Sequence, residues 1–394
     1  MIDLIRCPPE MWRLLAFAVS LPWLFDAGVR RILAWAARGR QPDNDGVPGA
    51  ELRWLVVIPA RAEGRAVIPT LASVIEAARG QHVRIVLLLD GGDQEAEQAA
   101  KELSISTVSK EPAGPTKGAA LGWLTQNHSD LLDETDAVLI LDVGSRLSPS
   151  FFADLAWPRG ADVVQARLHG MGAGVGQAAS LSETAAQEWQ DRGRQAVGWS
   201  VQLRGTGTAY TPAALRALAP NLRTSIEDTE ATLLLAAGGG RSVLGAEHAW
   251  VEDVKPERIA DAASQRSRWL VGQVAVVLRQ PGALLRLTAR KPFEGIAFTA
   301  GLLSRPLSVT AFLRLVLVMA FALDGLIGGG GTLALAVCGV LLVSLISDLT
   351  VLRHATGTTW ARLAKDGVRM LLTWGIALLM MPRALFGWVR TPRD

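Results

Sequence analysis

Cysteine and histidine are scarce in this chain, and the few that occur show no pattern. Its 394 residues include 2 cysteines and 5 histidines. Cys7 and Cys338 lie far apart in apolar surroundings, which excludes a disulfide framework and a zinc-binding spacing. A reducing compartment is therefore expected for the soluble part. The histidines have no ligand spacing either, so we expect them to be structural.

Net charge is also small, and no secretory signal is visible. The formal charge of +3 at pH 7 does not predict a nucleic-acid partner. The apolar stretch 11–25 lacks the small-residue cleavage site of a signal peptide. We interpret residues 10–37 as one helix in or on the membrane, and a membrane span is the favoured alternative.

Apolar residues are abundant, at 49% of the chain, but they are unevenly distributed. Charged residues occur throughout 51–280, whereas 300–390 is mostly apolar. This contrast predicts a soluble domain fused to membrane helices. We expect an N-terminal membrane helix and linker at 1–50, the soluble domain at 51–283, and an interfacial helix with three transmembrane helices at 284–394.

The C-terminal third contains the predicted membrane segments. The predicted spans are 308–327, 332–352 and 367–388, and the more polar stretch 284–303 is predicted to lie at the interface. The loop after the second span carries Arg353, Arg362, Lys365 and Arg369 against Asp366. The positive-inside rule places this loop, and with it the soluble domain, in the cytoplasm. The sequence thus predicts a multi-pass protein of a bacterial-type cytoplasmic membrane.

Apolar strands alternate with helices at the start of the soluble domain. Strands are expected at 52–60, 83–90, 105–110, 136–144 and 161–168, with a glycine-rich loop and a helix at 205–218. Continuous apolar strands separated by helices predict an α/β fold with a parallel sheet covered on both faces. Ligands bind such sheets beyond the carboxyl ends of their strands, where Asp90 and Asp142 are predicted to lie.

Three carboxylates are predicted to converge at this edge of the sheet. Asp90 and Asp142 end neighbouring strands, and Asp228 is expected on a loop before a helix. Such a set suits a nucleoside diphosphate, with one carboxylate for the base or ribose, one for a divalent cation and one to take a proton from an attacking hydroxyl. Structural roles stay open as alternatives, as turn residues for Asp90 and Asp142 and as a dipole-favoured acid for Asp228.

Three side chains share one face of a predicted helix further along the chain. Gln265, Arg268 and Trp269 have the spacing i, i+3, i+4. A guanidinium suits an anion such as a departing phosphate, and an indole suits a sugar ring. Arg268 and Trp269 would equally suit a helix anchored at the membrane surface.

These segments resemble a known family. Seven stand in family order: VVIPARAE (56–63), LLLDGGD (87–93), TKGAALGW (116–123), LILDVGS (139–145), GTGTAY (205–210), IEDTE (226–230) and QRSRW (265–269). Over residues 52 to 280 the chain resembles the membrane-bound family 2 glycosyltransferases, which include the cellulose, chitin and hyaluronan synthases and related glycolipid transferases.

The resemblance implies a fold and a reaction. The fold is a glycosyltransferase-A-type α/β domain, Rossmann-like with a mostly parallel sheet, together with transmembrane helices. The reaction is an inverting transfer of a sugar from a nucleotide donor, a UDP-sugar, to a lipid-linked or growing glycan acceptor. Asp228 would be the catalytic base, while Gln265, Arg268 and Trp269 would hold the diphosphate and the acceptor sugar.

The resemblance also implies the binding residues. The nucleotide would contact Pro59, Ala60, Glu63, Asp90, Lys117 and Asp142, the acceptor would contact Gly205, Thr206, Gly207 and Trp269, and Mg²⁺ or Mn²⁺ would bind Asp142. Lys117 could equally be an ordinary solvated lysine at a helix start.

Two positions depart from the family pattern. Gly144 replaces the second aspartate of the D-x-D motif, so Asp93 or Ser145 would have to compensate for the lost metal ligand. Ala62 stands where the family usually has Asn. An inactive homologue that binds nucleotide sugar, or is a scaffold in a polysaccharide export complex, therefore stays open as the alternative. A transporter is disfavoured because three or four spans make a poor pore.

Overall fold

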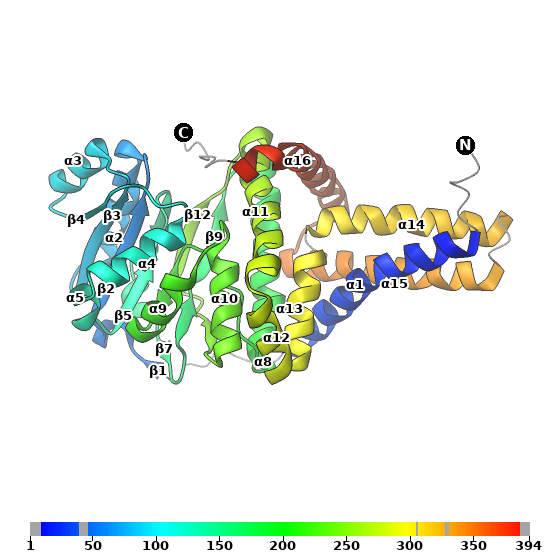
Figure 1. Ribbon diagram of the computed structural model, residues 1–394, viewed down its shortest axis with the longest axis horizontal. Helices are drawn as coiled ribbons and strands as arrows, with labels where there is room; N and C mark the ends of the chain where they lie inside the picture. Colours follow the sequence, from blue (N-terminus) through cyan, green and yellow to red (C-terminus); the bar gives the residue numbers. More distant parts are fainter. Residues whose placement is uncertain (1–8, 39–45, 305, 328–330, 387–394) are drawn as a thin grey trace.

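A parallel α/β sheet forms the centre of the soluble part (Figure 1). The computed structural model describes residues 9–38, 46–304, 306–327 and 331–386. Within them, seven strands form this sheet in the order β11 (Ser242–Leu244), β8 (Val163–Gln165), β10 (Thr208–Tyr210), β5 (Ala137–Ile140), β2 (Trp54–Ala60), β3 (Val83–Asp90) and β4 (Ser106–Lys110). β5, β2, β3 and β4 pair in parallel, and β10 lies antiparallel between β5 and β8.

Both faces of the sheet are covered by helices. The helices packed on it include α2 (Ile68–Ala77) and α3 (Gln94–Glu102) on one face and α4 (Lys117–Asn127), α9 (Pro212–Leu218) and α10 (Glu227–Gly238) on the other. Along β2, Val56 and Ile58 pack into the first core, while Leu55 and Val57 pack into the second. Successive side chains of a strand point to opposite faces, so a strand covered on both faces is apolar throughout.

The structure differs from the expected elements in four places. Asp228, expected on a loop before a helix, lies in the first turn of α10. Residues 208–210, expected in a loop, form β10 inside the sheet. The sequence does not predict this strand, because three residues are too few to show a period. β5 ends at Ile140, two residues before Asp142. The strand expected at 161–168 is divided between β8 and β9 (Arg167–Met171).

A second, three-stranded sheet lies beside the large one. It has the order β6 (Ser145–Leu147), β12 (Trp250–Val254), β9. The following helical segment consists of α7 (Val175–Ala185), the π-helical segment η4 (Ala186–Asp191) and α8 (Arg192–Ala196). The long helix α11 (Ile259–Arg279) comes after β12 and carries Gln265, Arg268 and Trp269.

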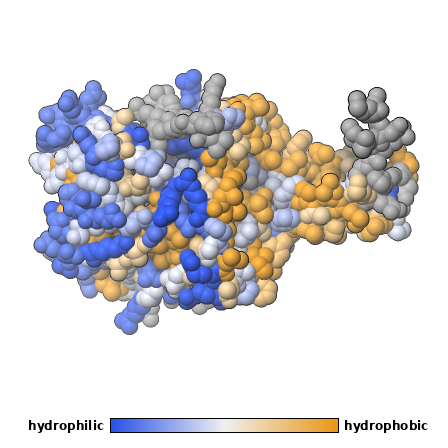
Figure 2. All heavy atoms as spheres, viewed as in Figure 1, coloured by the Kyte–Doolittle hydropathy of each residue, from blue (hydrophilic) through white to orange (hydrophobic). Residues whose placement is uncertain are grey.

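Three long apolar helices extend away from the α/β domain (Figure 1). They are α1 (Pro9–Ala36), α14 (Leu307–Ile327) and α15 (Gly331–Thr356). Among the described residues, these are the helices long and apolar enough to cross a membrane. Figure 2 shows hydrophobic side chains over this half of the molecule and hydrophilic ones over the α/β domain. The helices expected at 10–37, 308–327 and 332–352 are thus confirmed as candidate spans.

The third predicted C-terminal span is not confirmed. Residues 367–388 fall mostly on α16 (Trp360–Phe386), and their last two lie outside the described residues. In the part of the chain that the structure describes, α16 is not a candidate span. One face of α16 packs on α11, where Trp374 and Ala377 are buried against Ala263.

The remaining predicted boundaries are only partly visible. The linker expected at the end of the segment 1–50 includes residues 39–45, which lie outside the described part of the chain. The interfacial segment expected at 284–303 is made of α12 (Pro281–Arg290) and α13 (Pro292–Ser304), which share a core with α10.

Charged side chains in the three apolar helices are paired with one another. Arg13 of α1 contacts Asp324 of α14 through two hydrogen bonds of 2.7 and 2.9 Å. Arg30 of α1 contacts Asp348 of α15 at 3.0 and 2.8 Å, and Arg314 of α14 reaches the same carboxylate at 2.6 Å. Such pairing is what a charge inside a membrane requires.

Candidate functional site

The predicted site residues are contributed by separate segments of the α/β domain and by α11. At the strand ends, Pro59 and Ala60 end β2, Glu63 follows β2, Asp90 ends β3 and Asp142 follows β5. At the helix starts, Lys117 is the first residue of α4 and Asp228 lies in the first turn of α10. Gly205, Thr206 and Gly207 precede β10. The polar residues therefore stand at strand ends and helix starts, as expected for a ligand site of an α/β sheet.

One cavity of about 2250 Å³ connects these segments. Every residue predicted for the site lines it except Gly207, which packs against Val251 and Ala166. The cavity continues from the sheet edge to the helices α14, α15 and α16, where Phe312, Leu349 and Trp374 line it. It is therefore polar at the sheet edge, whereas the end near the candidate spans is lined mainly by apolar side chains together with the ion pair of Arg30 and Asp348.

Lys117 lies at the centre of the polar end. Its Nζ donates to Asp142 Oδ1 at 2.9 Å and to the carbonyl oxygen of Gly205 at 2.9 Å, and it lies 2.6 Å from Glu227 Oε1. Burial alone would lower the pKa of Lys117, but the charges of Asp142 and Glu227 outweigh it and raise the pKa. One ammonium group thus links the loop after β5, the glycine-rich loop and α10.

Asp228 is half-buried beside the glycine-rich loop. Gly205 has a φ of +78°, and a Cβ placed on it would lie 3.5 Å from Asp228 Oδ2. Burial raises the pKa of Asp228 to about 7, helped by the charge of Glu227 and opposed by the amide of Thr229 and the charge of Lys117. A carboxylate with a pKa near neutrality, at a cavity wall, is suited to general base chemistry.

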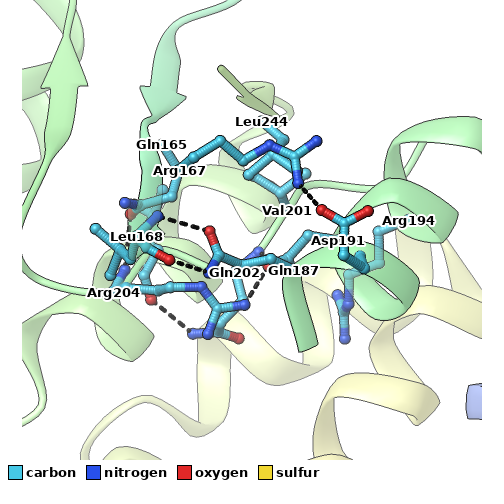
Figure 3. Close-up of polar contacts among 12 residues, drawn as sticks. Gln165, Arg167, Leu168, Gln187, Asp191, Arg194, Val201, Gln202, Arg204 and Leu244 are labelled. Atoms are coloured by element: carbon cyan, nitrogen blue, oxygen red, sulfur yellow. Dashed lines mark hydrogen bonds and ion pairs between the residues drawn. The ribbon is translucent and has the colours of Figure 1, made fainter. Parts of the chain in front are cut away.

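A buried polar network holds the glycine-rich loop in place through hydrogen bonds (Figure 3). Gln165 Oε1 accepts from the amide of Arg204 at 2.9 Å, and Gln165 Nε2 donates to the carbonyl oxygen of Thr206 at 3.0 Å. Asp191 of η4 accepts from the amide of Gln202 at 3.1 Å and pairs with Arg204. These residues were not predicted, because single buried glutamines and one aspartate inside a helix carry no motif.

Asp90 is buried at the end of β3 and is held by its surroundings. Its Oδ1 accepts from the amide of Gly114 at 2.7 Å and lies 3.5 Å from Lys110 Nζ, and its Oδ2 lies 3.8 Å from Arg61. Nearby, Ala62 has a φ of 54°, a left-handed conformation that Asn adopts more readily than Ala. The left-handed backbone at this position thus explains why an asparagine, the usual residue of the family, would suit it.

The residues around Asp142 provide one carboxylate for a divalent cation. Gly144 has no side chain, and Ser145 Oγ is hydrogen-bonded to Thr206 Oγ1 at 2.9 Å. Asp93 caps α3, accepts from the amides of Ala96 and Gly64, and does not line the cavity. Asp93 thus does not replace the missing aspartate, whereas Ser145 lines the cavity beside Asp142 and could add a hydroxyl but no second carboxylate. The described residues contain no group of three His, Cys, Asp or Glu that could hold a metal ion.

Helix α11 brings the predicted anion-binding face to the same cavity. Gln265, Arg268 and Trp269 all line it. Ser225, just before α10, donates through its Oγ to the carbonyl oxygen of Arg268 at 3.2 Å, which ties α11 to the segment of Asp228. The structure therefore brings Asp90, Asp142, Asp228 and Arg268 to one cavity, as the sequence predicts.

A second ion-paired group at the cavity wall was not predicted. Lys255 Nζ lies 2.8 Å from Glu183 Oε2 and 2.5 Å from Asp253 Oδ2. All three residues line the cavity. Glu183 lies on α7, about seventy residues before the other two. No short sequence motif therefore contains all three residues.

Comparison with protein families gives one match. The model of the glycosyl transferase family group 2 matches residues 137–381. This range includes Asp142, Asp228 and the whole of α11. No curated protein matches the sequence.

The solved structures that match this chain include three sugar transferases. The mannosyltransferase PcManGT from Pyrobaculum calidifontis, in complex with GDP-Man and Mn²⁺, has a TM-score of 0.54 at 15% identity, covering 93% of this chain and 99% of that chain. Glucosyl-3-phosphoglycerate synthase from Mycobacterium tuberculosis, with Mn²⁺, UDP and phosphoglyceric acid, has a TM-score of 0.37 at 21% identity, covering 60% and 79%. Mannosyl-3-phosphoglycerate synthase from Rubrobacter xylanophilus has a TM-score of 0.41 at 15% identity, covering 63% and 84%. The first of these shares its fold with this chain.

Proposed function

Since the chain belongs to the glycosyl transferase family group 2 and is a glycosyltransferase of the GT-A fold, we propose that it transfers a sugar from a UDP-sugar, with inversion, to a lipid-linked or growing glycan acceptor. The observation that carries this proposal is the position of Asp228. Its carboxylate lies at the wall of the cavity that Asp142 and Arg268 also line, next to the glycine-rich loop.

In the proposed reaction Asp228 takes the proton from the acceptor hydroxyl. The oxygen then attacks the anomeric carbon of the donor from the face opposite the diphosphate, and the bond between that carbon and the diphosphate oxygen breaks. Arg268 neutralises the negative charge of the leaving diphosphate, because a guanidinium forks onto two phosphate oxygens. Gln265 and Trp269, on the same face of α11, orient the diphosphate and the acceptor sugar.

The donor nucleotide is proposed to bind at the ends of β2 and β3. Pro59, Ala60, Glu63 and Asp90 line this part of the cavity. A divalent cation, Mg²⁺ or Mn²⁺, supplies neutralising charge when bound, and Asp142 together with the phosphates of the donor suffices as a ligand set, since Mg²⁺ often binds one carboxylate plus substrate phosphates.

The acceptor is proposed to enter from the apolar end of the cavity. This end is lined by residues of α14, α15 and α16, two of which are candidate spans. A lipid carrier can place its chains there while its sugar reaches Trp269 and Gly205. The reaction would then take place at the cytoplasmic face of the membrane. The positive-inside rule supports this side, because Arg353 lies in the last turn of α15 and Arg362, Lys365 and Arg369 lie in the first turns of α16.

The experiment that tests this function is a donor screen. The purified full chain in nanodiscs is incubated with UDP-sugars and GDP-sugars, Mg²⁺ or Mn²⁺ and a membrane lipid extract, and nucleoside diphosphate release is measured. The proposal expects release from a UDP-sugar and none from its Asp228→Asn variant. Tight nucleotide binding without release from any donor would instead identify an inactive homologue, and release from GDP-sugars alone would refute the proposed nucleotide.

A further inference from the structure

Arg266 of α11 is a buried cation that the proposed reaction does not use. The residue is 2% exposed. Its Nη1 donates to the carbonyl oxygen of Ala262 at 3.0 Å, within its own helix, and its Nη2 lies 3.5 Å from Met370 Sδ. Among the described residues its Nε has no hydrogen-bond partner.

Aromatic rings flank this guanidinium. Its central carbon lies 6.0 Å from the ring centroid of Trp269 and 5.5 Å from that of Trp374 on α16. Cation–π contacts of this kind stabilise a cation in place. They do not occupy the N–H donors in the plane of the guanidinium, of which Nε has no partner among the described residues.

No carboxylate balances the charge of Arg266 in the described part of the chain. The nearest acid along α16, Asp366, pairs instead with Arg362 and Arg369. Burial lowers the pKa of Arg266 to about 10, and no acid opposes this shift. Because buried charges in proteins are almost always paired, an isolated one signals a missing anion.

The surroundings of Arg266 define what kind of anion fits. Arg266 lines the cavity, as do Phe312 and Leu315 of α14 and Leu349 and Leu352 of α15. Arg268 lies two residues further along α11, which places it on the opposite side of the helix. Arg266 therefore does not share the helix face of Arg268, although Trp269 lies beside it. The cavity that Arg266 lines extends to α14 and α15, which are candidate spans.

We propose that Arg266 binds the anionic headgroup of a membrane lipid, whose chains occupy the apolar end of the cavity between α14, α15 and α16. The guanidinium forks onto two oxygens of a phosphate group, and the two indoles keep it in place. A soluble anion would satisfy the charge but leave the apolar walls uncovered. The proposed acceptor would use the same end of the cavity and the same Trp269, so the two lipids would compete there, but binding of the anionic lipid needs no sugar donor and is measured without transfer.

The test measures thermal unfolding of the full chain in a nonionic detergent. Phosphatidylglycerol, phosphatidylcholine or inorganic phosphate is added to the parent and to Arg266→Met. The control is Arg286→Met, an exposed arginine on the neighbouring helix α12. Without lipid, Arg266→Met should be as stable as the parent or more so, because an apolar side chain of similar size removes an unpaired buried charge.

With lipid, the parent and Arg286→Met should gain stability as phosphatidylglycerol is added, and Arg266→Met should require roughly 10-fold more of it or show no gain. Arg266→Lys, which keeps the charge but not the fork, should show an intermediate gain. Phosphatidylcholine and inorganic phosphate should have no effect.

Three results would overturn the proposal. An equal response of Arg266→Met to phosphatidylglycerol would remove Arg266 from the site. A full response to inorganic phosphate would replace the lipid with a soluble anion. Failure of Arg266→Met to fold, with no response of Arg266→Lys or the parent to phosphatidylglycerol, would make Arg266 a clamp between α11 and α16. None of these results depends on sugar transfer, which the donor screen tests separately.

Discussion

Lys117 Nζ lies 2.6 Å from Glu227 Oε1, on the residue that precedes the proposed base in the sequence. Through this contact and its 2.9 Å hydrogen bond to Asp142, the ammonium group joins the proposed donor and base ends of the cavity. Its charge also lowers the pKa of Asp228, against the effects of burial and Glu227. Lys117 thus has a positioning role besides any contact with the nucleotide.

Replacing Lys117 with Met should shift the pH dependence of sugar transfer. Without the ammonium group the pKa of Asp228 rises, so the base loses its proton at higher pH and the rising limb of log kcat/KM moves upward in pH. Lys117→Arg should restore part of the shift. The exposed Lys101, paired with Glu97 on the surface, provides the control. An unchanged profile with lower kcat would show that Lys117 acts on structure alone.

The parent enzyme should itself show a rising pH profile. Asp228 acts as a base only when ionised, and its pKa is raised to about 7. Values of kcat/KM should therefore fall about tenfold per pH unit below this pKa and level off above it, because they report the free enzyme. The measurement is initial nucleoside diphosphate release between pH 5 and 9, in about half-unit steps. A profile flat down to pH 5 would contradict the role of Asp228.

Gly205→Ala should lower activity more than stability. Gly205 and Gly198 have similar φ values of +78° and +76°, so alanine at either position should cost about 1 kcal/mol of folding free energy. A Cβ on Gly205 meets Glu227, Lys117 and Asp228, whereas one on Gly198 meets nothing within 4 Å.

Comparing the two variants separates strain from function. Thermal unfolding should be shifted alike in both, while kcat should fall in Gly205→Ala only. Equal activities would show that the glycine-rich loop does not control the position of Asp228.

Asp348→Asn should destabilise the three-helix bundle. This carboxylate pairs with Arg30 and with Arg314, whose side chain is fully buried. Removing one partner of a buried ion pair costs about 3 kcal/mol or more, because the remaining charge is left unbalanced. Thermal unfolding in detergent measures the loss. Asp133→Asn, at the exposed pair with Arg216, should leave stability almost unchanged.

The sequence predicts the sheet and the cavity wall better than the contacts inside the cavity. Long buried strands such as β2 and β3 have a continuous apolar pattern, and their ends place Asp90 at the site. Asp142 and Asp228 stand in segments that resemble the family, so their convergence was predictable. β10 was missed because three residues show no period.

The remaining features depend on contacts between distant segments. The pairing of Lys117 with Glu227, the support of Arg204 by Asp191, and the isolated charge of Arg266 join residues of different helices and loops. No local pattern encodes which partner a charged side chain will find, and only the folded chain shows that Arg266 has no carboxylate partner among the described residues.

The central claim is that Asp228 is the base of a sugar transfer, and one paired measurement tests it most directly. Binding of the donor nucleotide sugar and its turnover are measured for the parent and Asp228→Asn in the same nanodiscs. The account predicts unchanged donor affinity and a loss in kcat of about 100-fold or more in the variant. Turnover by Asp228→Asn at the rate of the parent would contradict it.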